Sequence, residues 1–169
     1  MIGRFKELMM KKKLLLAVLV AAMAFALVGC AEKSAQEQLD DYKSLESVNA
    51  FVTESHDNLG LLLDYNNSSN PDITQVASTQ AAIETLCDDI INENNVPEKC
   101  KPIHENLVGA ANELKSASDY LGDSAIAISV GDIVGSTHDL ENATEHINNY
   151  GDFLSKEDDE VSKLQSDNQ

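Results

Sequence analysis

The chain has 169 residues, with 29 acidic side chains, 12 basic side chains and a formal net charge of −17 at pH 7. This excess of acid argues against a nucleic-acid-binding protein, because contact with phosphates requires a basic surface. It also argues against electrostatic attachment to anionic lipids.

The first feature along the chain is an apolar run over residues 14–28, preceded by the basic residues 11–13. A transmembrane helix needs about 20 apolar residues, so this run is too short to cross a membrane. Its length and basic leader are typical of the hydrophobic region of a signal peptide. Met10 stands directly before the lysines and would make a normal start, so we expect translation to begin there.

The run ends in Leu27-Val28-Gly29-Cys30, which resembles the lipobox of bacterial lipoprotein precursors. The resemblance covers residues 10–30 only. It implies that residues 1–29 are a signal peptide removed by cleavage, and that Cys30 carries a thiol-linked diacylglycerol and an amide-linked chain such as palmitate. Several acyl chains make a lasting anchor, here on the extracytoplasmic face of a bacterial membrane. An uncleaved membrane helix and a conventional secretory signal are the alternatives.

The chain from Cys30 onward is long enough for one domain with its own core. Five of the basic residues and one acidic residue lie before it, so it carries a net charge of −21. Its other two cysteines are Cys87 and Cys100. In an oxidising compartment such a pair predicts a disulfide, which would contribute about 3 kcal/mol. Two free thiols are the alternative.

Four segments of this chain have apolar residues at every third or fourth position, which predicts amphipathic helices. They lie at about 39–63, 73–90, 103–128 and 133–154, and the last can extend to Val161 and Leu164. Gly131 is expected to end the third helix in a left-handed conformation, and Asp132 to cap the fourth. The third segment is rich in alanine and glycine, which predicts loose packing or a contact surface.

This pattern predicts an all-α fold in which each helix buries one apolar stripe against the others. An antiparallel four-helix bundle with up-down-up-down topology, over residues 39–155, satisfies that requirement. Residues 30–38 are expected to form a lipidated tether. Residues 156–169 are expected to form an acidic, polar tail without structure.

The candidates for a metal site are His56 and His104, each followed by a carboxylate, Asp57 and Glu105. Imidazole and carboxylate together suit zinc, copper or nickel, provided that the fold brings the two pairs together. We favour the alternative, in which each histidine lies at the surface or boundary of an amphipathic helix. The sequence has no di-iron or haem motif, so no cofactor is expected.

No catalytic pattern stands out: there is no Gly-x-Ser-x-Gly elbow, Gly-rich phosphate loop or His-Glu-x-x-His helix. We therefore expect a protein that is not an enzyme. Its predicted role is a non-catalytic protein-interaction module of the cell envelope, with an envelope protein as partner. The alternative is a binding protein for a metal ion or a small cationic ligand, and a cell-wall hydrolase is a third possibility.

Overall fold

The structure is a computed structural model that describes residues 33–166. The predicted signal peptide, the lipobox cysteine Cys30 and residues 167–169 lie outside the described residues. Ser34–Gln169 forms one compact unit. Its described residues form five α-helices and one short 3-10 helix, with no β-strand among them, which confirms the predicted all-α class. None of these described helices is long and apolar enough to cross a membrane.

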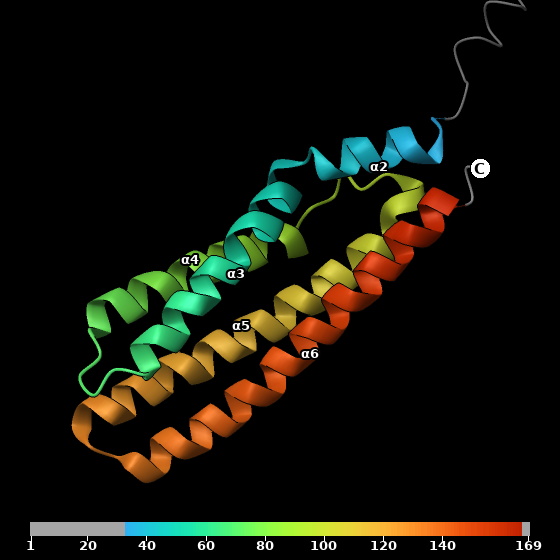
Figure 1. The fold of residues 1–169 in the computed structure, drawn as a ribbon. Helices are drawn as coiled ribbons and strands as arrows, with labels where there is room; N and C mark the ends of the chain where they lie inside the picture. The colour runs from blue at the N-terminus through green and yellow to red at the C-terminus, as the bar shows by residue number, and fades with distance from the viewer. Residues whose placement is uncertain (1–32, 167–169) are drawn as a thin grey trace, which may run out of the picture. The chain divides into compact units, whose positions relative to one another are not determined.

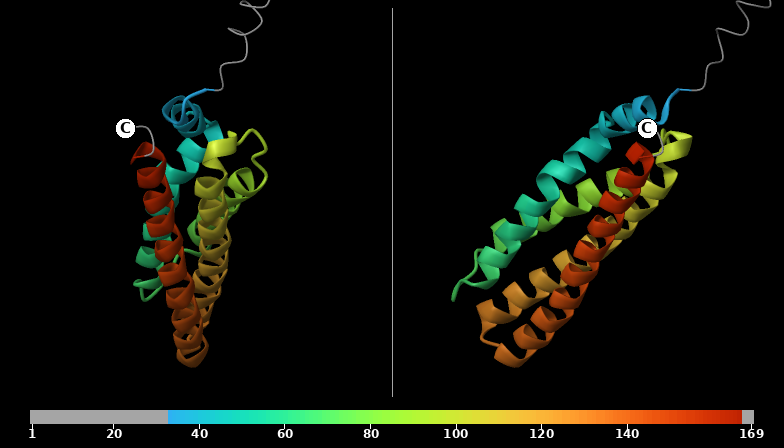
Figure 2. Two further views of the ribbon diagram at one scale, coloured as in Figure 1. Left: turned by 90° about the vertical axis from the view of Figure 1, so that its right-hand side faces the viewer. Right: turned by 45° about the vertical axis from the view of Figure 1, so that its right-hand side comes forward.

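In chain order the helices of the unit are α2 (Ala35–Lys43), α3 (Glu46–Asn66), α4 (Ile73–Ile91), the 3-10 helix η1 (Glu98–Cys100), α5 (Lys101–Val130) and α6 (Ile133–Ser166). Among the described residues, α5 and α6 are the two longest helices and lie side by side (Figure 1). Helix α2, the start of α5 and the end of α6 gather at one end of the unit, called here the α2 end (Figures 1 and 2). The turn between α5 and α6 lies at the opposite end.

Local sequence signals explain where the helices begin and end. Ser34 and Glu37 form a capping box at the start of α2, and Asp72 accepts hydrogen bonds from two backbone N–H groups at the start of α4. Gly131 ends α5 with a φ of 77°, in the left-handed region that glycine adopts without strain. The Asp132 carboxylate accepts a hydrogen bond from the Gly135 N–H at 2.9 Å. The predicted roles of Gly131 and Asp132 are thus confirmed.

The first predicted helix is in fact two helices, because the chain turns at Ser44 and Leu45. The backbone of Leu45 is extended, with φ −61° and ψ 132°, and its side chain packs against the core. The Ser44 hydroxyl donates to the Asp41 carbonyl at 2.7 Å, which closes the last turn of α2. Periodicity alone missed this break, since the apolar spacing continues across it.

The predicted limits of the domain are wrong at both ends. Residues 35–38 belong to α2 and not to a tether, and residues 156–166 belong to α6 and not to an unstructured tail. Val161 and Leu164 pack against the core, so the last turns of α6 are held in place despite their acidic composition. Most helical stability comes from packing of this kind rather than from local propensity.

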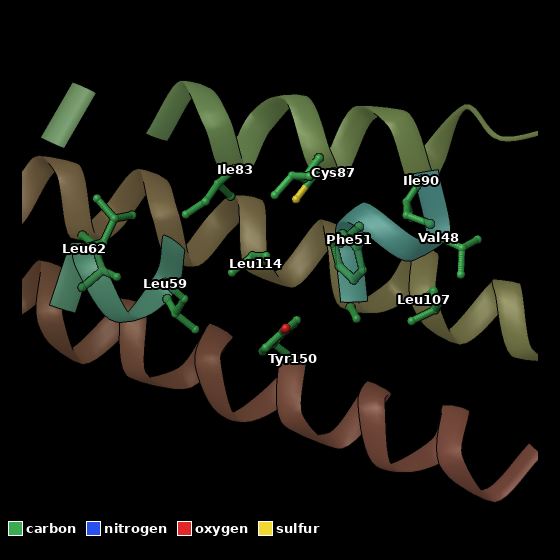
Figure 3. Close-up of a cluster of buried hydrophobic side chains, with 14 of the residues drawn as sticks. Val48, Phe51, Leu59, Leu62, Ile83, Cys87, Ile90, Leu107, Leu114 and Tyr150 are labelled. Carbon is green, nitrogen blue, oxygen red and sulfur yellow. The ribbon is translucent and has the colours of Figure 1, made fainter. Parts of the chain in front are cut away.

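Helices α3, α4, α5 and α6 all contribute side chains to the core (Figure 3). Phe51 and Leu62 from α3, Ile83 from α4 and Leu114 from α5 are fully buried, and Tyr150 of α6 is 5% exposed. The Tyr150 hydroxyl lies 3.0 Å from the hydroxyl of Ser55, so a buried hydrogen bond joins α6 to α3.

Helices α5 and α6 approach each other closely along the alanine- and glycine-rich part of α5. A Cβ atom added at Gly109 would overlap the ring of Phe153 on α6. Ala110, Ala111 and Ala117 are fully buried in this region. Of the two alternatives expected for this region, loose packing is therefore wrong, and the small residues make a tight contact surface between α5 and α6.

Candidate functional site

A groove of about 330 Å³ lies at the α2 end, where side chains of α2, α3 and α6 meet. Its walls are largely apolar, from three valines and one tyrosine ring, and its polar lining comprises one amine, two carboxylates and one amide. The lining residues are Tyr42, Lys43, Val48, Asn49, Val52, Glu157, Asp158 and Val161. The three charged groups give the lining a formal charge of −1.

Tyr42 forms the buried part of this groove. It is 1% exposed, and its hydroxyl shares a hydrogen bond of 3.1 Å with Nδ1 of His104 on α5. The two rings meet edge to face, with centroids 5.9 Å apart. Burial raises the pKa of the Tyr42 hydroxyl, with a further contribution from Glu157, and burial lowers the pKa of His104. Both groups are therefore uncharged at neutral pH.

Glu157 occupies a position on α6 that the helical pattern assigns to an apolar residue. Side chains that recur every three or four residues along α6 face the rest of the unit, and all of them are buried or half-buried. The members of this stripe are Ser136, Leu140, Ala143, Ile147, Tyr150, Leu154, Glu157, Val161 and Leu164. Glu157 is the one charged member, and it faces the groove.

The environment of Glu157 disfavours its charge. Burial raises the pKa of its carboxyl group above the ordinary range, the neighbouring Asp158 raises it further, and Lys43 acts in the opposite direction. Within residues 33–166, no hydrogen bond or ion pair is made by the Glu157 carboxylate. A half-buried carboxylate without a partner is costly to keep, and groups of this kind are frequent at functional sites.

A second polar cluster joins α5 to α6 farther along the hairpin. Glu113 Oε2 lies 2.7 Å from Nδ1 of His146 and accepts a hydrogen bond from Asn149, and the ring of Tyr120 stacks on the imidazole. The hydrogen bond from His146 lowers the pKa of Glu113. Because every member of this cluster already has a partner, we interpret it as a clamp between the two helices.

The structure does not assemble a metal site from the histidines singled out in the sequence. His56 is exposed on α3, whereas His104 is half-buried and bonded to Tyr42. Across the part of the chain that the structure describes, no three histidine, cysteine or carboxylate side chains are arranged to hold a metal ion.

The predicted disulfide is also absent from the structure, because Cys87 and Cys100 are both free and buried. The Lys115 amine lies 2.9 Å from a carboxylate oxygen of Asp88, which places residue 88 of α4 level with residue 115 of α5. Cys100 directly precedes α5, and 15 residues of helix span roughly 22 Å. A disulfide requires Cα atoms within about 7 Å, so the antiparallel packing of α4 and α5 separates the pair.

The end of the unit opposite the α2 end has a different surface. Ile126, Val130, Ile133 and Val134 lie on both sides of the α5–α6 turn and are 47%, 75%, 66% and 82% exposed. We call these four residues the apolar tip. From residue 124 to residue 138, Asp132 is the only charged side chain.

Sequence reasoning missed both the groove and the apolar tip as sites. The groove combines elements that are more than a hundred residues apart, so no local motif could reveal it. One signal was available, since Glu157 interrupts a stripe that continues through Leu154, Val161 and Leu164.

Comparison with protein-family models, with curated proteins and with solved structures finds no match to this chain.

Proposed function

We propose that this chain is a bacterial lipoprotein, anchored through Cys30 on the extracytoplasmic face of a membrane, whose helical domain is a non-catalytic protein-interaction module. The anchor rests on the resemblance of residues 10–30 to a lipobox. Four residue steps separate Cys30 from Ser34, and extended chain of that length spans at most about 14 Å. The lipid would therefore hold the α2 end near the membrane surface.

The proposed architecture is an antiparallel four-helix bundle of α3, α4, α5 and α6, with α2 added at one end. Contacts of α3 with α4, of α4 with α5 and of α5 with α6 support up-down-up-down topology. Helix α6 has 34 residues, which corresponds to a length of about 51 Å. The apolar tip would then stand about 50 Å from the anchored end.

The apolar tip is the observation that carries the interaction proposal. Its four aliphatic side chains are exposed in a region of 15 residues with one charge, in a chain of which 24% is charged. Exposed apolar surface of this kind marks interaction sites. The side chains project from a narrow helical turn, so the partner is expected to offer an apolar recess. A second copy is a poor partner, because two bodies of charge −21 repel each other.

The test is photo-crosslinking of the full-length protein in the native envelope, with a photoreactive residue at Val134. A matched position is Glu145, which is exposed on the same helix. We expect one adduct of defined mass from position 134 and none from position 145, and we expect Val130→Asp to abolish the adduct.

Failure of each part of the proposal gives a distinct result. If position 134 gives no adduct while the protein is in the membrane fraction, the interaction proposal is wrong. If the intact mass of the unmodified protein purified from membranes retains residues 1–29 and includes no acyl chains, the anchor proposal is wrong.

A further inference from the structure

The groove at the α2 end has the features of a small-molecule binding site. It is separate from the apolar tip, which is the surface proposed to bind a protein partner. Its volume of about 330 Å³ falls at the lower end of the range for small-molecule pockets. Val48, Val52 and Val161 supply apolar walls, and the charged groups are confined to Lys43, Glu157 and Asp158. Val52 is 57% exposed and Val161 is half-buried, so these two walls are accessible from solvent, whereas Val48 is buried.

Two observations about Glu157 point to a cationic ligand. The first is position: Glu157 stands in the inward stripe of α6, where an aliphatic side chain would pack without electrostatic cost. The second is the lack of any protein partner for its carboxylate among the described residues. Lys43 lies close enough to act on Glu157 electrostatically, yet no ion pair forms between the two. A cationic ligand would supply the missing partner.

The charge balance and the walls together define the ligand. One positive charge neutralises the formal charge of −1 on the lining. A second positive charge would lie near the amine of Lys43, which disfavours a diamine. The apolar surface that Val52 and Val161 expose in the groove is then best covered by carbon.

We propose that this groove binds a small aliphatic monoamine in its protonated form. Its ammonium group contacts Glu157 and Asp158, and its carbon chain lies along Val48, Val52 and Val161. The proposal does not rest on the interaction proposed for the apolar tip, because the two surfaces are at opposite ends of the unit.

The experiment is a calorimetric titration of the detergent-solubilised full-length protein with three probes that share one carbon chain. These are butylammonium chloride, 1-butanol and sodium butyrate, at constant ionic strength, with ammonium chloride as the control for charge alone. We expect saturable binding of one butylammonium per chain. Binding of butanol and of ammonium should be at least tenfold weaker, and butyrate should not bind.

Two variants test whether the groove is the site. Glu157→Gln keeps the shape and removes the charge, and we expect it to weaken butylammonium binding at least tenfold. Asp159→Asn is the matched control, because it removes one charge from an exposed position two residues away that does not line the groove, and we expect no change. Val52→Phe fills the groove from an exposed position and should also abolish binding.

Several outcomes would overturn the proposal. Equal losses from Glu157→Gln and Asp159→Asn would mean that the acidic surface attracts cations without a site. Equal affinity for butanol and butylammonium would mean that the carboxylates take no part. Absence of saturable butylammonium binding to the unmodified protein, with its helical circular dichroism intact, would reject the site outright.

Discussion

The two ends of the helical unit differ in which side chains they bury and which they expose. At the α2 end, a half-buried glutamate shares a groove with a lysine and an aspartate. At the other end, four aliphatic side chains are exposed around a single aspartate. Each end breaks a different expectation, since charges usually face water and large apolar groups usually face the core. Both departures cost folding free energy, and this is why we propose that both ends bind other molecules.

The largest expected effect comes from comparing two truncations on α5, one in the core and one at the apolar tip. Leu114 is fully buried, so Leu114→Ala should lower the free energy of unfolding by about 3 kcal/mol. Ile126→Ala on the same helix should cost less than about 1 kcal/mol, since this side chain is already half in water. Urea denaturation followed by circular dichroism measures both. Equal losses would show that the apolar tip is part of the core.

Two glycines test how tightly α5 packs on α6. Gly109→Ala should lower stability by about 1 kcal/mol, because the overlap with Phe153 outweighs the better helix propensity of alanine. At Gly60, within α3, an added Cβ would meet no atom within 4 Å. Gly60→Ala should therefore raise stability by about 0.5 to 1 kcal/mol. A gain from both substitutions in thermal melts would contradict the close contact.

The single charge near the apolar tip is expected to serve the helix rather than a partner. Asp132→Ala removes the hydrogen bond to the Gly135 N–H and should cost about 1 kcal/mol. Asp132→Ser, which can still cap the helix, should restore most of the loss. Adduct formation by a photoreactive residue at position 134 should survive the serine substitution. If it does not, the charge of Asp132 belongs to the interaction surface.

The smallest effect is expected at Glu157, where the substitution should raise stability, as it should at Gly60. The pKa of this carboxyl group is raised in the folded state, so its ionised form opposes folding at neutral pH. Glu157→Gln should raise stability at pH 7 by no more than about 0.5 kcal/mol. The gain should disappear as the pH falls through the folded-state pKa, where the unmodified carboxyl takes up its proton. A loss of stability at pH 7 would mean that Glu157 has a partner within the protein.

The helices could be predicted from the sequence where two signals were both present: an apolar stripe at helical spacing, and residues that begin or end a helix on either side of it. For α4 and α5 both signals were present, and Gly131 and Asp132 marked the turn between α5 and α6. The extension of α6 to Val161 and Leu164 followed from their spacing, but the domain was ended at residue 155 because the acidic composition of residues 156–169 was given more weight. The break at Ser44 was missed because it lies within one continuous spacing.

The sites could not be predicted in the same way, because they depend on which residues of neighbouring helices lie side by side. Two cysteines 13 residues apart predicted a bond, yet the antiparallel course of α4 and α5 separates them. The converse holds for the groove, where Tyr42 and Glu157 meet although they are 115 positions apart. Sequence spacing reports distance within one helix, whereas a site is made between helices.

The two buried thiols can be used to measure how fast different parts of this protein unfold. Burial raises the pKa of Cys87 to about 12 and also raises that of Cys100, so neither sulfur reacts while the helices are closed. Modification by a thiol reagent then proceeds at the rate at which each region opens. Cys87 lies at the centre of the core and reports the opening of the whole unit. The Cys100 thiol lies 3.4 Å from the Gln38 carbonyl of α2, so its modification reports the separation of α2 from the rest of the unit.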